Sequence, residues 1–237
     1  VGFRRIRLAG PLRTAFWVRA VTEVGIVDYF STHLASSSDD RPCDAATCPP
    51  PCELDDSVNT CQARQVVEYA ETAADPEAVV VIGGDLNATP TEPTIAVVTD
   101  AGYVDTHLAA GNPECDPATG AQCTSGRIDD AMTDLTDANS LQQERIDYLF
   151  LGGTRDCTSQ EPTGLFNGSP MAGDLAFPSD HTGVIAALEC TTSEEVLAAA
   201  TDVTMPPTTT TATTTGGGEP DAATAAAIDE AFNTLFS

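Results

Sequence analysis

Short apolar runs bounded by turn residues recur along the first 190 residues of the chain. Thr14–Thr22 and Gly25–Ser31 are rich in β-branched and aromatic residues and are separated by two residues, a pattern that predicts a β-hairpin. Ala78–Ile82 is a continuous apolar run followed by two glycines, which predicts a fully buried strand. Two further buried strands are predicted at Arg145–Leu151 and Gly183–Leu188.

Two segments have the periodicity of helices. Gln62–Ala74 places Val66 and Val67 on its inward face, and Thr94–Ala101 begins directly after Pro93, a residue favoured at helix starts. Helices interspersed among buried strands indicate a mixed α/β (α+β) domain.

The composition changes late in the chain. Residues 1–190 contain every arginine and every cysteine, whereas 191–220 are rich in Pro, Thr and Gly, the composition of a disordered linker. Residues 221–237 regain the apolar periodicity of a helix. So short a helix cannot bury its apolar stripe alone. Two interpretations remain open: a frayed tail, or the start of a further domain that continues after Ser237.

The chain is strongly acidic. It carries 36 Asp and Glu against 10 basic residues, all of them Arg, for a formal charge of −26. Because such a chain repels a nucleic-acid backbone, we expect no stable nucleic-acid binding through a basic groove. The cluster of Arg4, Arg5 and Arg7 is interpreted as a loop solvated by its own charge. No apolar run approaches the roughly 20 residues of a membrane-spanning helix, so no transmembrane segment is predicted.

Eight cysteines lie mostly in loop-like sequence rich in Pro, Asp and Gly. This placement favours disulfides, and disulfides indicate an oxidising compartment, so we expect a secreted or cell-surface protein. A cluster of four cysteines leaves zinc binding as the alternative, although its spacing lacks the usual C-x2-C pairs. Partners are expected among neighbours in sequence: Cys115 with Cys123, Cys157 with Cys190, and Cys43, Cys48, Cys52 and Cys61 among themselves.

The cysteine-bearing segments at 36–61 and 109–140 are expected to be surface insertions. The chain begins without an initiator Met and without a signal peptide, so we interpret it as a mature form or a fragment.

Polar motifs stand at the ends of the predicted strands, where rigid elements commonly position catalytic groups. Each motif alone is also typical of an ordinary turn or of a core histidine. Asp147 is harder to explain in this way, because a carboxylate inside an apolar strand requires a partner. The motifs are Thr32-His33-Leu34, Gly84-Asp85-Leu86-Asn87-Ala88-Thr89-Pro90, Arg145-Ile146-Asp147-Tyr148 and Ser179-Asp180-His181-Thr182.

Taken in this order, the four motifs resemble the endonuclease/exonuclease/phosphatase family, the deoxyribonuclease I-like phosphoesterases. The resemblance extends from about Phe3 to Leu188. It implies a four-layer α/β/β/α sandwich. It also implies a divalent-metal-dependent phosphoesterase that uses Mg²⁺, with Mn²⁺ or Ca²⁺ as alternatives.

The resemblance implies a role for each matching residue. Asp85 would orient or deprotonate the attacking water, and Asn87 would donate an amide hydrogen to a phosphoryl oxygen. His181 would contact the scissile phosphate while Asp147 holds its ring. His33 would be a second histidine that donates to the phosphate.

The implied metal ligands are Asp180, Asp85 and Asn87, because Mg²⁺ prefers hard oxygen ligands. Asp105 matches a recurrent position of the family. Its role stays open between helix capping, support of other site residues and catalysis.

The first half of the family pattern is missing from the chain. A strand carrying an Asn, the principal metal-binding Glu and the acidic partner of His33 should all precede the segment at Arg5–Arg13, and Glu23 is no substitute. We therefore expect only the C-terminal half of the sandwich. An apolar face built from Val79–Ile82 and Tyr148–Leu151 should then be exposed, which predicts dye binding and non-cooperative melting of the isolated chain.

The sequence predicts an exported phosphoesterase that hydrolyses phosphodiesters or phosphomonoesters, with the activity of this chain alone left open. The substrate classes are nucleic acid, a lipid headgroup and a small organic phosphate, and the acidic charge favours the last two. The alternative is a non-catalytic, disulfide-stapled surface or binding module on the same fold.

Overall fold

The computed structural model describes residues 2–10, 13–22, 25–36, 40–44, 48–49, 52, 55–127, 133–166 and 176–191. All of them belong to the first of two compact units, which covers Val1–Asp202. The predicted helix at 221–237 and the predicted linker beyond residue 191 lie outside the described residues.

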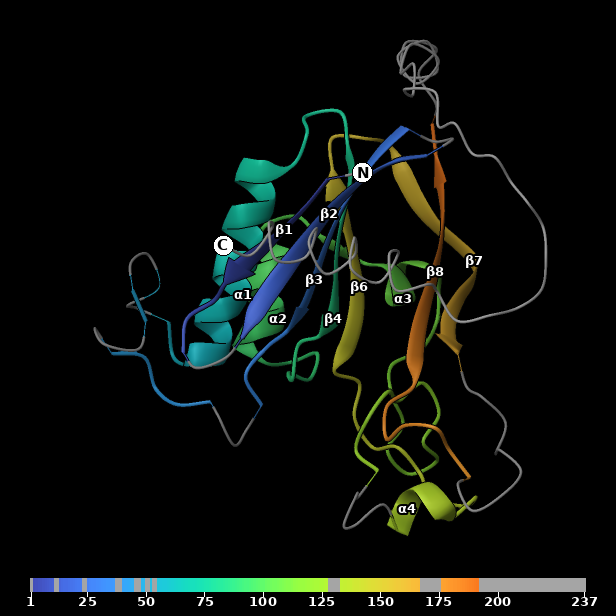
Figure 1. The fold of residues 1–237 in the computed structure, drawn as a ribbon. Helices are drawn as coiled ribbons and strands as arrows, with labels where there is room; N and C mark the ends of the chain where they lie inside the picture. Colours follow the sequence, from blue (N-terminus) through green and yellow to red (C-terminus); the bar gives the residue numbers. More distant parts are fainter. Residues whose placement is uncertain are drawn as a thin grey trace, which may run out of the picture. The chain divides into compact units, whose positions relative to one another are not determined.

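The described residues form a six-stranded sheet with the helices α1 and α2 on one face and a two-stranded sheet on the other (Figure 1). The pair β3–β4 is parallel, and the other neighbouring pairs of the large sheet are antiparallel. In spatial order the large sheet consists of β1 (Gly2–Arg7), β2 (Thr14–Thr22), β3 (Gly25–His33), β4 (Val79–Asp85), β6 (Asp147–Gly153) and β5 (Val104–Asp105).

The remaining elements of the described residues are the two strands of the small sheet and four helices. The small sheet pairs β7 (Cys157–Phe166) with β8 (Gly183–Cys190). The helices are α1 (Val58–Ala73), α2 (Pro93–Asp100), α3 (Thr106–Ala109) and α4 (Thr133–Thr136).

The main core lies between the large sheet and the helices α1 and α2. Phe30, Ile82 and Phe150 project from three neighbouring strands and are at most 1% exposed. Val66 of α1 and Val98 of α2 pack in the same cluster. The apolar runs at Ala78–Ile82 and Arg145–Leu151 therefore form central strands, as predicted, and the mixed α/β class is confirmed. The run at Gly183–Leu188 instead forms β8 of the small sheet, where no residue is buried, so its predicted burial is wrong.

The opposite face of the large sheet carries an apolar row across five strands. Phe3, Val18, Tyr29, Val81 and Leu151 are successive partners in the strand register and so project from the same face. Exposure falls along this row from 49% at Phe3 to 9% at Val81 and 7% at Leu151. The face is therefore covered over β4 and β6 and open at β1, and Val104 on the opposite edge strand β5, the partner of Leu151, is 50% exposed.

The small sheet provides this cover. Leu188 and the Cys157–Cys190 disulfide pack against a cluster that contains Val81 and Leu151. The expectation that the apolar runs of β4 and β6 would be exposed is therefore wrong, because β7 and β8 lie over them. The exposed apolar side chains of this face are instead at its two edges: Phe16 at 43% on β2 with Phe3 on β1, and Val104 at 50% on β5.

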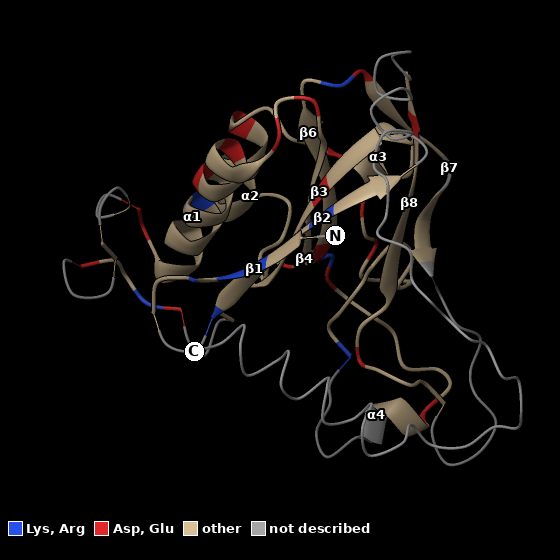
Figure 2. Ribbon diagram, turned by 45° about the horizontal axis from the view of Figure 1, so that its top comes forward, with Lys and Arg blue, Asp and Glu red and all other residues tan. Residues whose placement is uncertain are grey.

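Several element boundaries differ from the prediction. The hairpin of β2 and β3 is confirmed. Helix α1 begins four residues before the predicted Gln62, because the hydroxyl of Ser57 accepts a hydrogen bond from the backbone N–H of Thr60 and caps it. The predicted arginine loop is wrong: Arg4, Arg5 and Arg7 lie on β1, whose backbone pairs with β2 while Ile6 packs on the core (Figure 2).

All eight cysteines are paired with neighbours in sequence. The pairs are Cys43–Cys48, Cys52–Cys61, Cys115–Cys123 and Cys157–Cys190. No free cysteine remains to hold zinc, so the zinc interpretation is wrong. The segment 36–61 is also more than a surface insertion, since Cys48, Cys52 and Cys61 are fully buried beside Val58.

The helices of the described residues also bear on membrane insertion. None of them is both long enough and apolar enough to cross a bilayer.

The open end of the apolar row gives a testable prediction. We expect Phe16→Thr to lower the fluorescence of a hydrophobic dye bound to the chain, because Phe16 is among the large apolar side chains exposed on this face. Stability should change by only about 0.5 kcal/mol, as is usual at exposed sites. The matched control is Leu108→Thr on α3, at 42% exposure. Equal dye binding by both variants and the wild type would contradict an open face at β1 and β2.

Candidate active site

The register of three adjacent strands brings three polar residues of the motifs side by side. His33 ends β3 and is the partner of Asp85 at the end of β4, and Asp85 is in turn the partner of Asp147 at the start of β6. Register partners project from the same face of a sheet. The Nε2 atom of His33 accordingly lies 3.4 Å from Oδ2 of Asp85.

The turn after β4 is fixed by its own backbone chemistry. A Cβ atom at Gly84 would lie 2.0 Å from the carbonyl oxygen of Thr32, so only glycine fits there. Asp85 Oδ1 accepts a hydrogen bond from the backbone N–H of Asn87 at 2.9 Å, and Asn87 adopts φ 48°. The amide of Asn87 donates to the carbonyl oxygen of Leu34 at 3.0 Å. The sequence around Asp85 therefore forms a turn and also holds the carboxylate in place.

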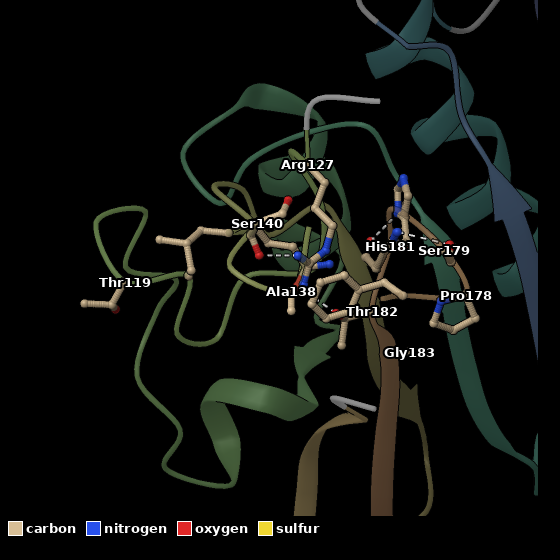
Figure 3. Close-up of a pocket in the computed structure, with 14 residues that line it drawn as sticks. Thr119, Arg127, Ala138, Ser140, Pro178, Ser179, His181, Thr182 and Gly183 are labelled. Carbon is tan, nitrogen blue, oxygen red and sulfur yellow. Dashed lines mark hydrogen bonds and ion pairs between the residues drawn. The ribbon is translucent and has the colours of Figure 1, made fainter. Parts of the chain in front are cut away.

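His181 reaches the same cluster from the loop before β8. Its Nδ1 atom lies 2.9 Å from Oδ2 of Asp147, and its Nε2 atom lies 3.2 Å from the hydroxyl of Ser125. Its backbone N–H donates to the hydroxyl of Ser179 (Figure 3). Ligand atoms of Asp85, Asp147 and His181 all lie within 4.8 Å of one another.

The charges of the cluster influence one another strongly. The hydrogen bond to Asp147 raises the pKa of His181 to about 9, and the negative charges of Asp147, Asp85 and Asp180 act in the same direction against the effect of burial. The imidazole is therefore protonated at neutral pH. Burial and the charge of Asp147 raise the pKa of Asp85, although the N–H of Asn87 opposes this. Asp85 is thus a partly buried carboxylate with increased proton affinity.

Four of the predicted site residues form one cluster, and Asp180 lies at its border. His33, Asp85, Asp147 and His181 lie together. Asp180 borders this group, with Oδ2 at 4.0 Å from Nε2 of His181 and its side chain 44% exposed.

The predicted roles of Asn87 agree only in part with its contacts. One amide hydrogen is engaged by a backbone carbonyl, so a single further N–H is available for a phosphoryl oxygen.

Sequence reasoning missed the segment that supports this cluster. Thr124 is fully buried, and its hydroxyl accepts hydrogen bonds from the backbone N–H groups of Ile146 and Asp147. The side chain of Gln142 donates to the carbonyl oxygens of Thr124 and Asp180. The expectation that 109–140 is only a surface insertion is therefore wrong for the residues that follow Cys123. Thr124 and Gln142 belong to no periodic hydrophobic pattern. The available signal was the position of Gln142 just before the Arg-Ile-Asp-Tyr motif.

A buried ion-pair network lies behind the cluster. The guanidinium of Arg145 is 1% exposed and binds Asp105 at 2.7 Å and Glu114 at 2.7 Å. Asp105 also accepts a hydrogen bond from the backbone N–H of His107 and so caps α3. Of the roles left open for Asp105, capping and support of other residues are the ones that its contacts describe.

Comparison with known proteins identifies the family. The sequence profile of the Endonuclease/Exonuclease/phosphatase family matches residues 13–181. This chain belongs to the endonuclease/exonuclease/phosphatase family. Its members are hydrolases that act on phosphodiester or phosphomonoester bonds. A search of curated protein sequences gives no match.

Solved structures of this family share the fold. TDP2 from D. rerio, complexed with a single-strand DNA product, is 18% identical, with a TM-score of 0.52 over 80% of this chain and 67% of that chain. An endonuclease/exonuclease/phosphatase protein from Beutenbergia cavernae is 20% identical, with a TM-score of 0.50 over 80% of this chain and 45% of that chain. The human Nocturnin catalytic domain with bound sulfate is 14% identical, with a TM-score of 0.50 over 81% and 59%. This chain therefore spans about half to two thirds of the length of these structures.

The contact between Asp147 and His181 gives a prediction about pH. In chelator-treated protein, Asp147→Asn should lower the pKa of His181 from about 9 towards its ordinary value of 6.5, because the ionic hydrogen bond is lost. The pKa is measured from the imidazole NMR signals, with Asp100→Asn on α2 as the control of equal charge change.

The same contact has a consequence for stability. A raised pKa means that protonated His181 stabilises the fold fully below pH 6.5 and that this contribution is lost as the pH rises through about 9. The difference in unfolding free energy between wild type and Asp147→Asn should shrink over that range. An unchanged pKa of His181 in Asp147→Asn would contradict this account.

Proposed function

We propose that the chain is the C-terminal half of an exported, divalent-metal-dependent phosphoesterase of the deoxyribonuclease I-like type. The observation that carries this proposal is the strand register that aligns His33, Asp85 and Asp147, with His181 protonated beside them. An aligned base, a cation and paired carboxylates are the groups that phosphoester hydrolysis requires.

The carboxylates present fit a hard divalent cation such as Mg²⁺, with Mn²⁺ or Ca²⁺ as alternatives. Asp85 and Asp147 are close enough for one to raise the pKa of the other, which indicates local negative charge that a cation would neutralise. Asp85, Asp180 and the side-chain oxygen of Asn87 are the proposed ligands. A bound cation would supply charge neutralisation at the phosphoryl oxygens.

The chain's own residues would perform the other tasks. Protonated His181 would donate from Nε2 to a phosphoryl oxygen, while Asp147 keeps its ring oriented and charged. Asp85, whose raised proton affinity suits a base, would hold the attacking water and accept its proton. His33 and the remaining amide hydrogen of Asn87 would donate to the phosphate.

The missing half of the sandwich is part of this proposal. The apolar row is open at β1 and β2, and among the described strands β8 pairs only with β7. A second sheet that continues from the outer edge of β8 would cover the row. The shorter span of this chain relative to its structural relatives supports the same idea.

The proposed domain organisation follows from composition. Residues 1–190 would be the partial catalytic domain, 191–220 a linker, and 221–237 the start of a helix. Four disulfides support export, because such bonds persist in oxidising compartments.

Hydrolysis of a chromogenic phosphodiester tests the proposal. We expect turnover that needs Mg²⁺ and is abolished by chelator, either from this chain or from a version extended upstream. His181→Gln should lower the rate by at least about 100-fold, the contribution of a positioned acid or base. Asp100→Asn on α2 serves as the control that keeps full activity. Turnover that is insensitive to chelator, or that survives in His181→Gln, would overturn the assigned chemistry.

A further inference from the structure

A hollow of about 640 Å³ opens directly beside the catalytic cluster. Asp147 and His181 form part of its wall, so it begins where the scissile phosphate would sit. Figure 3 shows His181 and Arg127 among the residues that line it. Its size is that of sites that hold a small organic molecule and is far larger than a phosphate group requires. The part of the substrate attached to the phosphate therefore has room here.

One guanidinium lines this hollow among the residues that the structure describes in its wall, that of Arg127. The guanidinium carbon of Arg127 lies 3.6 Å from the ring centroid of Phe177, and a guanidinium nitrogen donates to the carbonyl oxygen of Ser140. Stacking and this hydrogen bond hold the charged group against the wall. A guanidinium has five N–H donors in a planar fork, a geometry that matches carboxylate and phosphate oxygens.

The rest of the wall is largely apolar. Leu141, Phe177 and Pro178 line it, and Leu141 is 46% exposed. An apolar wall between His181, which would face the scissile phosphate, and the guanidinium of Arg127 suits a ligand with an organic body and two anionic groups.

We propose that this hollow is a substrate subsite selecting small organic phosphoesters that carry a second anionic group beyond the scissile phosphate. The inference rests on the proposed function, in which His181 faces the scissile phosphate, and Arg127 then binds the second anion. The net charge of −26 agrees with a small substrate, since a long polyanion would meet repulsion over the rest of the surface. A single guanidinium acts locally, where the charges of the remainder are screened over about 10 Å.

Matched phosphonates test this inference without requiring turnover. The probes are alkylphosphonates with two to eight carbons, each compared with the phosphonate of equal length that ends in a carboxylate. Binding is measured by calorimetry at fixed free Mg²⁺. At the best length, the carboxylate should tighten binding by about tenfold or more, as expected for a hydrogen bond between charged groups.

Substitution of Arg127 assigns the effect to this residue. Arg127→Gln should remove the advantage of the carboxylate, and Arg127→Lys should restore part of it, because Lys keeps the charge without the planar fork. The matched control is Arg4→Gln, which removes the same charge from an exposed position on β1 and should leave the advantage unchanged. Melting curves identify any variant that fails to fold. If Arg127→Gln fails to fold, the partial advantage of the carboxylate in Arg127→Lys tests the subsite instead.

The outcomes separate the two proposals. An equal advantage of the carboxylate in wild type and Arg127→Gln, or no advantage at any length in wild type, would overturn the subsite. Loss of the advantage in Arg127→Gln together with an absence of chelator-sensitive turnover would support the subsite and count against the phosphoesterase.

Discussion

The structure depends on the hydrogen-bonded register of β3, β4 and β6. A shift of one residue in either pairing would turn the polar partner towards the helices and away from the face that carries the site. The apolar residues of the same strands, such as Phe30, Ile82 and Phe150, fix this register by requiring burial under α1 and α2. The free energy of the core therefore also determines the geometry of His33, Asp85 and Asp147.

This arrangement gathers like charges that would otherwise repel. Asp85 and Asp147 lie within one small group of ligand atoms, and among the described residues His181, His33 and the backbone N–H of Asn87 offset the charge of Asp85. Support comes from the buried guanidinium of Arg145, which binds Asp105 and the partly exposed Glu114. It also comes from Thr124, whose hydroxyl binds the backbone of the Asp147 strand. The site is thus held rigid by residues that would not contact a substrate.

The sequence predicts the central strands, and the polar residues that gather at their ends, for one physical reason. A strand buried on both faces needs a continuous apolar run, and the polar motif that follows such a run lies at the strand end. The sequence did not reveal the strand β7, because most of its residues are polar and Pro162 interrupts them. A proline is tolerated in a strand only at an edge or an irregular position. The pairing of β7 with β8 is irregular there, since its register shifts between Gln160 and Gly164. Ser125 and Arg127 were missed because a loop residue is placed by tertiary contacts that leave no periodic pattern.

Binding of Mn²⁺, observed through the three histidine side chains, is the most direct test of the central claim. A paramagnetic ion bound by Asp85, Asp180 and Asn87 should broaden the imidazole NMR signals of His33 and His181 at low Mn²⁺ concentration. The signals of His107, which is buried outside the cluster against the carbonyl oxygen of Pro113, should stay sharp, and Asp85→Asn should weaken the effect. Broadening that is equal for all three histidines, or absent for His181, would contradict a metal-dependent site at these strand ends.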